Sequence, residues 1–406
     1  MNSHLNFDEF AARVRAFIGG ASDGLPGPDA NARFNELALA GFALQFQLIP
    51  AYQRLCETRG VTPQTVTNWS QIPFLTTATF KAYELTSIPA TERTTSFQSS
   101  GTTDHTPSRH YHNEGSLQLY EASLLPWFRR HFLADWDELE DAPEKPGLII
   151  LTPSPAQAPH SSLVYMFETA RRELGSRDSL FAGKVEAGGG WVLDVDQVLF
   201  ALRKSMCANR PLALLGTAFS FVHLLDHFAA NNIRYRLAEG SRAMETGGYK
   251  GRSREMPKRE LHKLITRHLG IPATHIITEY GMCELSSQAY DGAIGTLKEV
   301  GADVRRLTFT THSQANQSLL TSAPTAERRL FRFPPWARAR IVSPETGREL
   351  NYGETGLIQV LDLANVRAIM AVQTEDLGVR RADGFELIGR AAQSEPRGCS
   401  LMPITS

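Results

Sequence analysis

The sequence T-T-S-F-Q-S-S-G-T-T-D-H-T-P-S-R-H, at residues 94–110, is the most informative stretch of this chain. Its centre places four hydroxyl side chains and one glycine in consecutive positions: Ser99, Ser100, Gly101, Thr102 and Thr103. Glycine lets the backbone approach a ligand closely, and small hydroxylated neighbours offer hydrogen-bond donors without bulk, as a polyphosphate requires. Arg109 and His110 can add positive charge. The stretch therefore predicts a phosphate-binding loop, although in isolation such a segment is more often a Ser/Thr-rich surface turn.

The composition is that of an ordinary folded protein. Of the 406 residues, 42% are hydrophobic and 21% are charged, which argues against extensive disorder and predicts one large or several smaller lobes. The formal net charge of −1 gives no overall field that would favour nucleic acid or an anionic membrane. The four cysteines (Cys56, Cys207, Cys283 and Cys399) form no C-x-x-C pair, so neither a zinc site nor a disulfide framework is predicted.

No segment predicts secretion or membrane insertion. The first twenty residues are amphipathic and are interrupted by Asp8, Glu9, Arg13 and Arg15, unlike a secretory signal. The longest apolar run without Asp, Glu, Lys or Arg, residues 212–225, is too short for a membrane span. We therefore expect a cytoplasmic protein without a membrane span.

Alternating apolar runs and amphipathic segments predict an α/β core. Unbroken apolar runs at residues 147–151 and 212–215, and a further strand at 275–278, are typical of strands buried on both faces of a parallel sheet. Helices are expected over residues 114–131, 161–175, 191–208, 222–231 and 258–269, and a strand over residues 235–239. The segment ending at Phe97, the glycine loop and the helix from residue 114 give the order strand, loop, helix that suits anion binding.

The two ends of the chain differ from this core. Residues 7–18 and 31–60 have helical periodicity, with a break at Pro50. After residue 307, short extended segments alternate with Gly, Pro and Asp turns, which predicts a small β-rich lobe. We expect a helical N-terminal region at 1–90, an α/β nucleotide-binding core at 91–306, and a β-rich lobe with a short tail at 307–406.

Four further clusters carry candidate chemistry. In E-T-G-G-Y-K (245–250) two glycines present flat backbone suited to a purine, and Lys250 can meet a phosphate or carboxylate. E-Y-G-M-C-E (279–284) supplies an aromatic ring and a carboxylate suited to Mg²⁺. T-E-D (374–376) can present Asp376 to ribose hydroxyls, and D-G-F-E-L-I-G-R (383–390) ends in Arg390. Each alone is more often a turn, a strand end, a charged loop or a hairpin, but their order favours a nucleotide-activating site.

Together these motifs resemble the adenylate-forming superfamily of acyl-CoA ligases, and more narrowly the acyl-protein synthetase (LuxE-type) family. The closer resemblance lies in Q-S-S-G-T-T-D-H-T-P-S-R-H, G-T-A-F-S-F-V-H-L-L-D, M-E-T-G-G-Y-K-G-R-S-R-E, E-Y-G-M-C-E-L-S-S-Q-A-Y-D, A-V-Q-T-E-D-L-G and P-R-G-C-S-L. It extends from residue 94 to residue 401, and the first ninety residues match only loosely. It implies a large adenylate-forming core of parallel or mixed sheets flanked by helices.

The resemblance also implies roles for particular residues. The loop from Ser99 to Thr103 would hold the ATP phosphates. The adenine and ribose would be lined by Gly247, Gly248, Glu279, Tyr280, Gly281 and Asp376. Glu284 would bind Mg²⁺, with Cys283 near the adenylate phosphate and Arg390 at the hinge position of larger relatives. The acid would be lined by Gly216, Thr217, Phe219 and His223.

The sequence departs from the superfamily pattern in two ways. Asp104 stands where glycine is usual, so a negative charge lies beside the expected triphosphate site. The chain ends sixteen residues after Arg390, so the C-terminal domain with its catalytic lysine is expected to be absent, as in the acyl-protein synthetases. Lys250 is the candidate for the missing positive charge. Cys399, in R-G-C-S-L, aligns with the cysteine that becomes acylated, and Arg397 can favour its thiolate.

These features predict an enzyme that uses ATP and Mg²⁺ to convert a carboxylic acid, fatty or aryl, to an acyl-adenylate and passes the acyl group to Cys399. One alternative is a ligase that delivers the acyl group to coenzyme A or a carrier protein, with Cys399 idle. Another is a catalytically degenerate nucleotide-binding or scaffold homologue. An acyl reductase, an acyltransferase or a carrier protein is the expected partner.

Overall fold

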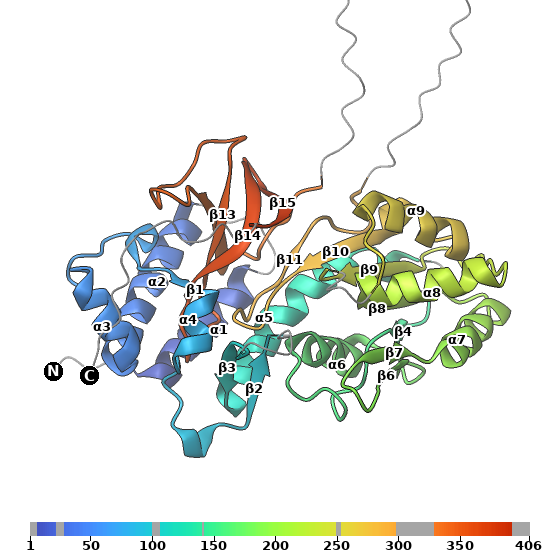
Figure 1. The fold of residues 1–406 in the computed structure, drawn as a ribbon, viewed down its shortest axis with the longest axis horizontal. Helices are drawn as coiled ribbons and strands as arrows, with labels where there is room; N and C mark the ends of the chain where they lie inside the picture. Colours follow the sequence, from blue (N-terminus) through green and yellow to red (C-terminus); the bar gives the residue numbers. More distant parts are fainter. Residues whose placement is uncertain are drawn as a thin grey trace, which may run out of the picture.

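The computed structural model describes residues 6–21, 28–99, 106–139, 142–248, 253–297 and 329–391. These residues form two large sheets, each flanked by helices, and two small hairpins (Figure 1). Short 3₁₀ turns connect them at η1 (Trp69–Gln71), η2 (Ala90–Glu92), η3 (Trp136–Glu138) and η4 (Ala273–His275).

The larger sheet has six strands in the order β11-β10-β9-β8-β4-β5. Its strands are β4 (Gly147–Ile150), β5 (Leu180–Phe181), β8 (Leu212–Thr217), β9 (Arg242–Thr246), β10 (Ile276–Tyr280) and β11 (Ala289–Tyr290). All neighbouring strands are parallel except β11, which runs antiparallel to β10. Every residue of β8, β9 and β10 is buried, as expected for central strands covered on both faces.

Helices cover both faces of this sheet (Figure 1). Alternation along β8 separates the two layers: Leu214 packs with α7 (Val195–Cys207), α8 (Ala218–Ala230) and α9 (Lys258–Leu269), whereas Leu215 packs with α5 (Glu114–Phe132) and α6 (Ser162–Leu174). The prediction of an α/β fold with helices flanking a parallel or mixed sheet is confirmed.

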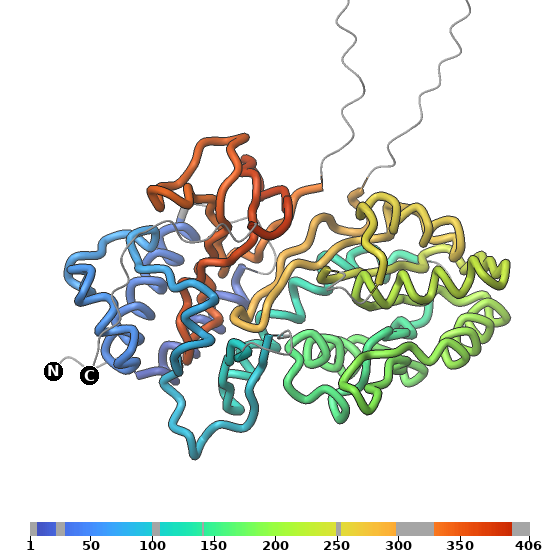
Figure 2. Tube along the Cα trace, viewed as in Figure 1, coloured from blue at the N-terminus to red at the C-terminus, as the bar shows by residue number. Residues whose placement is uncertain are grey.

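The second sheet lies beside the N-terminal helices. Its order is β1-β14-β13-β12, with β15 also paired to β14; the strands are β1 (Leu75–Thr76), β12 (Ala337–Val342), β13 (Thr355–Asp362), β14 (Ala371–Arg381) and β15 (Gly384–Arg390). Helices α1 (Phe7–Ala21), α2 (Pro28–Leu48), α3 (Pro50–Thr58) and α4 (Thr77–Ala82) complete this half of the molecule. Phe10 and Phe42 share one core with Val360 and Val372, so the first and last parts of the described chain lie together (Figure 2).

The glycine loop leads into a hairpin and not directly into a helix. Strands β2 (Thr95–Gln98) and β3 (Arg109–His112) pair antiparallel on either side of it, and α5 starts only after β3. His110 and His112 are buried while Arg109 and Tyr111 are partly exposed, which is the alternation of a strand with one covered face. The helix predicted at 114–131 is confirmed, and β3 was not predicted.

Two other predictions are wrong in detail. Residues 235–239 form no strand, because Tyr235 and Leu237 donate their N–H groups to the last carbonyls of α9, at His268 and Leu269. Residues 191–193, expected to begin a helix, form β7 (Trp191–Leu193), which pairs with β6 (Gly183–Val185). Helix α7 begins later, where the Asp194 carboxylate accepts the N–H of Gln197 at 3.1 Å.

Within the described ranges, no helix is long and apolar enough to cross a membrane.

Candidate functional site

The candidate site is built at the carboxyl ends of three parallel strands, where ligands bind in open α/β sheets. Strand β8 ends at Thr217, whose hydroxyl accepts the N–H of Ser220 at 3.2 Å and caps α8. Strand β9 ends at Thr246, followed by Gly247, and β10 ends at Tyr280. The topology therefore brings three of the sequence motifs to one edge of the sheet.

The Gly-Gly segment after β9 leaves open space at this edge. Gly247 has φ +69°, a conformation that favours glycine, and no atom of the described residues lies within 4 Å of a Cβ built at Gly247 or Gly248. A cavity of about 300 Å³ lies beside it, between the α8 and α9 side of the sheet and β15. Its walls include Glu245, Gly247, Lys258, Thr278, Phe331 and Ile388.

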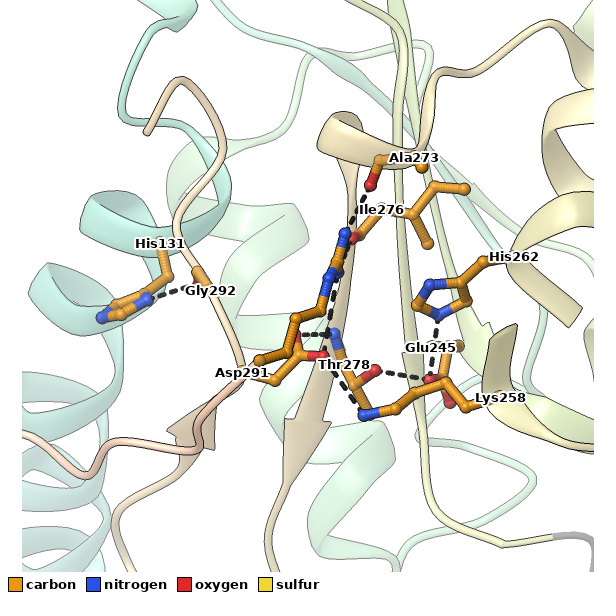
Figure 3. A network of polar contacts seen from close by, with 10 residues as sticks. His131, Glu245, Lys258, His262, Ala273, Ile276, Thr278, Asp291 and Gly292 are labelled. Atoms are coloured by element: carbon orange, nitrogen blue, oxygen red, sulfur yellow. Dashed lines mark hydrogen bonds and ion pairs between the residues drawn. The ribbon is translucent and has the colours of Figure 1, made fainter. Parts of the chain in front are cut away.

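A polar network underlies this cavity (Figure 3). The ammonium of Lys258 lies 3.2 Å from Oδ2 of Asp291, and Oδ1 of Asp291 accepts the N–H of Thr278 at 2.7 Å. Burial alone would raise the pKa of Asp291, but Lys258 and Arg329 lower it below its ordinary value. Glu245 accepts the hydroxyl of Thr278 at 2.6 Å. The cavity is thus lined by both charge signs and by apolar walls.

Tyr280 and Asp376 join the two large sheets at the site. The Tyr280 hydroxyl donates to Oδ2 of Asp376 at 2.9 Å, and Nε of Arg390 lies 3.8 Å from Oδ1. Burial raises the pKa of Asp376, although the Tyr280 hydrogen bond and the Arg390 charge act in the opposite direction. The Tyr280 ring packs edge-on against Phe331 and Phe385. The Arg390 side chain is largely exposed, so this residue borders the site from outside.

Glu284 lies beside the flank of the glycine loop. It is buried, and the hydroxyl of Ser108 donates to its Oε1. The Cys283 thiol lies 3.5 Å from the same hydroxyl and 3.2 Å from Oε2 of Glu284, and the Cys283 carbonyl is 2.9 Å from Nδ1 of His110. Burial, and then the Glu284 charge, raise the pKa of the Cys283 thiol well above its usual value. Cys283 is therefore held as a neutral thiol.

Two hydrogen bonds join Ser99 and Ser108, on either side of the glycine loop. Ser99 donates its N–H to the Ser108 carbonyl at 3.2 Å, and its hydroxyl accepts the Ser108 N–H at 3.0 Å. These two contacts place Ser99 next to Ser108 and hence next to Glu284. The remaining predicted loop residues, and two predicted catalytic residues, lie outside the described part of the chain: Ser100, Gly101, Thr102, Thr103, Lys250 and Cys399.

The other predicted residues surround this edge. The Glu279 carboxyl is buried and accepts a hydrogen bond from Thr246, and burial raises its pKa to about 7. Glu279 lies on the same face of β10 as Ile277, which packs with α5 and α6. This face is the one turned away from the cavity. Gly216 packs closely on Leu151. A Cβ at position 216 would lie only 2.9 Å from that side chain, so a larger residue would collide with it. Phe219 is buried on α8, and the exposed His223 lies edge-on to it, with ring centroids 6.4 Å apart.

Sequence reasoning missed the residues that hold the site together. Ser108 lies inside the most informative stretch, but one hydroxyl after Pro107 carries no distinguishing pattern. Lys258, the first residue of the helix expected at 258–269, lines the cavity, but none of the sequence motifs includes it. Asp362 and Asn365 contact the turn that bears Glu284 from β13 and the connection after it. No local motif marks Asp362 and Asn365 as part of the site, because their partners are distant in sequence.

This fold is similar to that of solved structures of an acyl-CoA ligase. The chain is similar to the crystal structure of 2-hydroxyisobutyryl-CoA ligase in an open conformation in complex with 2-HIB-AMP and CoA, with a TM-score of 0.57 and 13% identity, over 91% of this chain and 75% of the ligase. The same ligase in the postadenylation state with 2-HIB-AMP gives a TM-score of 0.56 and 12% identity, over 91% and 72% of the two chains. No protein-family model and no curated protein matches the sequence.

Proposed function

We propose that this protein activates a carboxylic acid with ATP to an acyl-adenylate and transfers the acyl group to a thiol. The observation that carries the proposal is the meeting of Glu284, Tyr280 and Asp376 at one sheet edge, with Glu284 bonded to the flank of the glycine loop. The fold likeness to a ligase bound to an acyl-adenylate, 2-HIB-AMP, supports it.

The chemistry explains why such a site is useful. A free carboxylate resists nucleophiles because oxide is a poor leaving group. A carboxylate oxygen attacks the α-phosphorus of ATP, and the bond to pyrophosphate breaks. A thiolate then attacks the carbonyl carbon, and AMP leaves with the electron pair of the cleaved bond. The protein's task is to position the reactants and neutralise charge.

We assign the nucleotide to the sheet edge. Ser99, Ser100, Gly101, Thr102 and Thr103 would hold the phosphates. Asp376 would accept hydrogen bonds from the ribose hydroxyls, and the base would lie against Gly247, Gly248, Tyr280 and Gly281, with Glu279 beside it. Cys283 would lie near the adenylate phosphate. Mg²⁺ is commonly held by one or two carboxylates plus substrate phosphates. The single buried carboxylate of Glu284 fits that role, and the described residues contain no cluster of three protein ligands. Mg²⁺ would neutralise phosphate charge.

The acid and the acceptor are assigned by the same proposal. The acid, fatty or aryl, would lie against Gly216, Thr217, Phe219 and His223. Cys399 is the proposed acceptor, Lys250 the proposed cation, and Arg390 the proposed hinge residue. The raised thiol pKa of Cys283 makes that cysteine a poor nucleophile. The alternative acceptor is a diffusible or carrier-bound thiol, which the ligase complex that contains CoA favours.

The decisive experiment is ATP–pyrophosphate exchange with a panel of carboxylic acids. Acid-dependent exchange is expected, and its absence with every acid would refute the proposal. Labelling with radioactive acid plus ATP then tests the acceptor. Cys399→Ser is expected to retain exchange but lose the hydroxylamine-sensitive label, whereas Cys207→Ser, at an exposed cysteine, should retain both. Exchange without any label on the wild type would favour a diffusible or carrier-bound thiol.

A further inference from the structure

Asp362, the last residue of β13, lies behind the turn that carries Glu284. Its carboxyl is fully buried and accepts four hydrogen bonds. Oδ2 accepts the N–H groups of Ser286 at 2.9 Å and Ser287 at 2.8 Å; Oδ1 accepts the Ser287 hydroxyl at 2.8 Å and the Ala364 N–H at 3.0 Å. Because all four groups donate, they fit an ionised carboxylate. Burial raises its pKa to about 6, which still leaves it ionised at neutral pH.

A directed relay of hydrogen bonds leads to this carboxylate. The indole N–H of Trp336 donates to Ser123 at 2.7 Å, and the Ser123 hydroxyl lies 2.9 Å from that of Ser287. An indole N–H can only donate and an ionised carboxylate can only accept. Both serine hydroxyls must therefore donate toward Asp362, so the relay has one arrangement.

Other residues of the turn, Cys283 and Glu284, are also fixed by hydrogen bonds. Asn365 donates to the backbone carbonyl of Glu284 at 2.7 Å, from the connection after β13. From the hairpin around the glycine loop, Ser108 donates to the Glu284 carboxylate and His110 contacts the Cys283 carbonyl. The backbone around Glu284 is thus fixed from the second sheet, and its side chain is fixed from the glycine-loop hairpin.

We infer that Asp362 is a positioning residue for Glu284, which holds the turn so that this carboxylate faces the phosphate end of the site. Asp362 acts through the backbone of Ser286 and Ser287, to which its carboxylate is bonded. It also joins the turn to the sheet that carries Asp376, so the two carboxylates keep their relative positions. The inference rests on the proposed function, because it assigns Glu284 to Mg²⁺.

Asp362→Asn tests the inference with almost no change in shape. Both carboxylate oxygens of Asp362 accept hydrogen bonds, and an amide nitrogen cannot accept one. Whichever oxygen the NH₂ group replaces, the two hydrogen bonds to that oxygen are lost. Loss of a group bonded directly to a metal ligand typically weakens metal affinity by about 10- to 100-fold. Asp362 acts one bond further away, so the half-saturating Mg²⁺ concentration in pyrophosphate exchange should rise by up to about tenfold. The half-saturating acid concentration should stay unchanged. Asp383→Asn, at an exposed carboxylate of the same lobe, is the matched control and should leave both values unchanged.

A second measurement does not depend on activity. Amide hydrogen exchange of the peptide at residues 281–290 should be faster in Asp362→Asn, because the N–H groups of Ser286 and Ser287 lose their acceptor. If the variant does not fold, Ser287→Ala, which removes one donor to Asp362, should give a smaller shift in the same direction. A folded variant with wild-type Mg²⁺ dependence or wild-type amide exchange would overturn the inference. If the wild-type protein shows no ATP–pyrophosphate exchange with any acid, the proposed function itself is overturned.

Discussion

The hydroxyl of Tyr280 donates to Oδ2 of Asp376 at 2.9 Å, across 96 residues of sequence. The bond joins β10 of the six-stranded sheet to β14 of the second sheet. Both partners are mostly buried, so the contact is shielded from water. It places an aromatic ring and a carboxylate side by side at the edge to which we assign the nucleotide.

The first prediction concerns this bond. Tyr280→Phe keeps the ring but removes the donor, and a hydrogen bond to a charged group contributes about 1.5–3 kcal/mol. The half-saturating ATP concentration in pyrophosphate exchange should rise by about tenfold or more. Tyr111→Phe is the control, because among the described residues the Tyr111 hydroxyl contacts only the exposed Glu84, at 3.3 Å. An unchanged ATP dependence in Tyr280→Phe would contradict the role of the Tyr280–Asp376 pair in nucleotide binding.

The second prediction concerns Ser108. Ser108→Ala leaves the Glu284 carboxylate without its hydroxyl donor, which should raise the half-saturating Mg²⁺ concentration by about tenfold or more. Titration of Mg²⁺ at saturating ATP measures the effect. Ser205→Ala, which removes a hydroxyl that donates to the Arg210 carbonyl just after α7, should not change it. Equal Mg²⁺ dependence in the two variants would contradict the role given to Ser108.

The third prediction concerns the pH dependence of stability. Burial raises the pKa of Glu279 from 4.5 to about 7, so the folded protein binds a proton more readily than the unfolded chain. The stabilising contribution is full below pH 4.5 and is lost as the pH rises through about 7. Glu279→Gln, which keeps the acceptor for Thr246, should therefore be the more stable protein at pH 8, by up to about 3 kcal/mol.

Thermal unfolding of both proteins between pH 5 and 8 measures this difference. The gain from Glu279→Gln should grow with pH and level off above about 7. A gain that is independent of pH would mean that Glu279 does not titrate in this range.

The fourth prediction concerns a buried charge at the start of β9, whose other end borders the site. Arg242 is fully buried, and its guanidinium lies 2.6 Å from Oδ1 of Asp135 and over the ring of Trp136. Asp135→Ala leaves this charge unpaired and should destabilise the protein by about 3–5 kcal/mol. Asp178→Ala, which breaks the exposed pair with Lys204, should have little effect. Chemical denaturation of both variants provides the comparison.

Local patterns in the sequence were sufficient for most of the elements. The helix expected at 258–269 is α9 with the same bounds, because its apolar positions recur on one face and Gly270 ends it in the left-handed conformation. The apolar run at 212–215 is part of β8. The segment at 235–239 has strand-like composition but bonds to the end of α9, since strand formation depends on the neighbours available for pairing.

The sequence by itself determined the α/β class and the motifs that meet at the site, because burial and backbone preference leave periodic and local marks. Only the tertiary structure decided that Ser108 meets Glu284 and that Tyr280 meets Asp376. It also decided that Asp362 bonds to the turn that carries Glu284. These contacts join segments that are 75 to 176 residues apart. Their pairing follows from strand order and from the packing of two sheets, and a single side chain such as Ser108 carries no local sign of its distant partner.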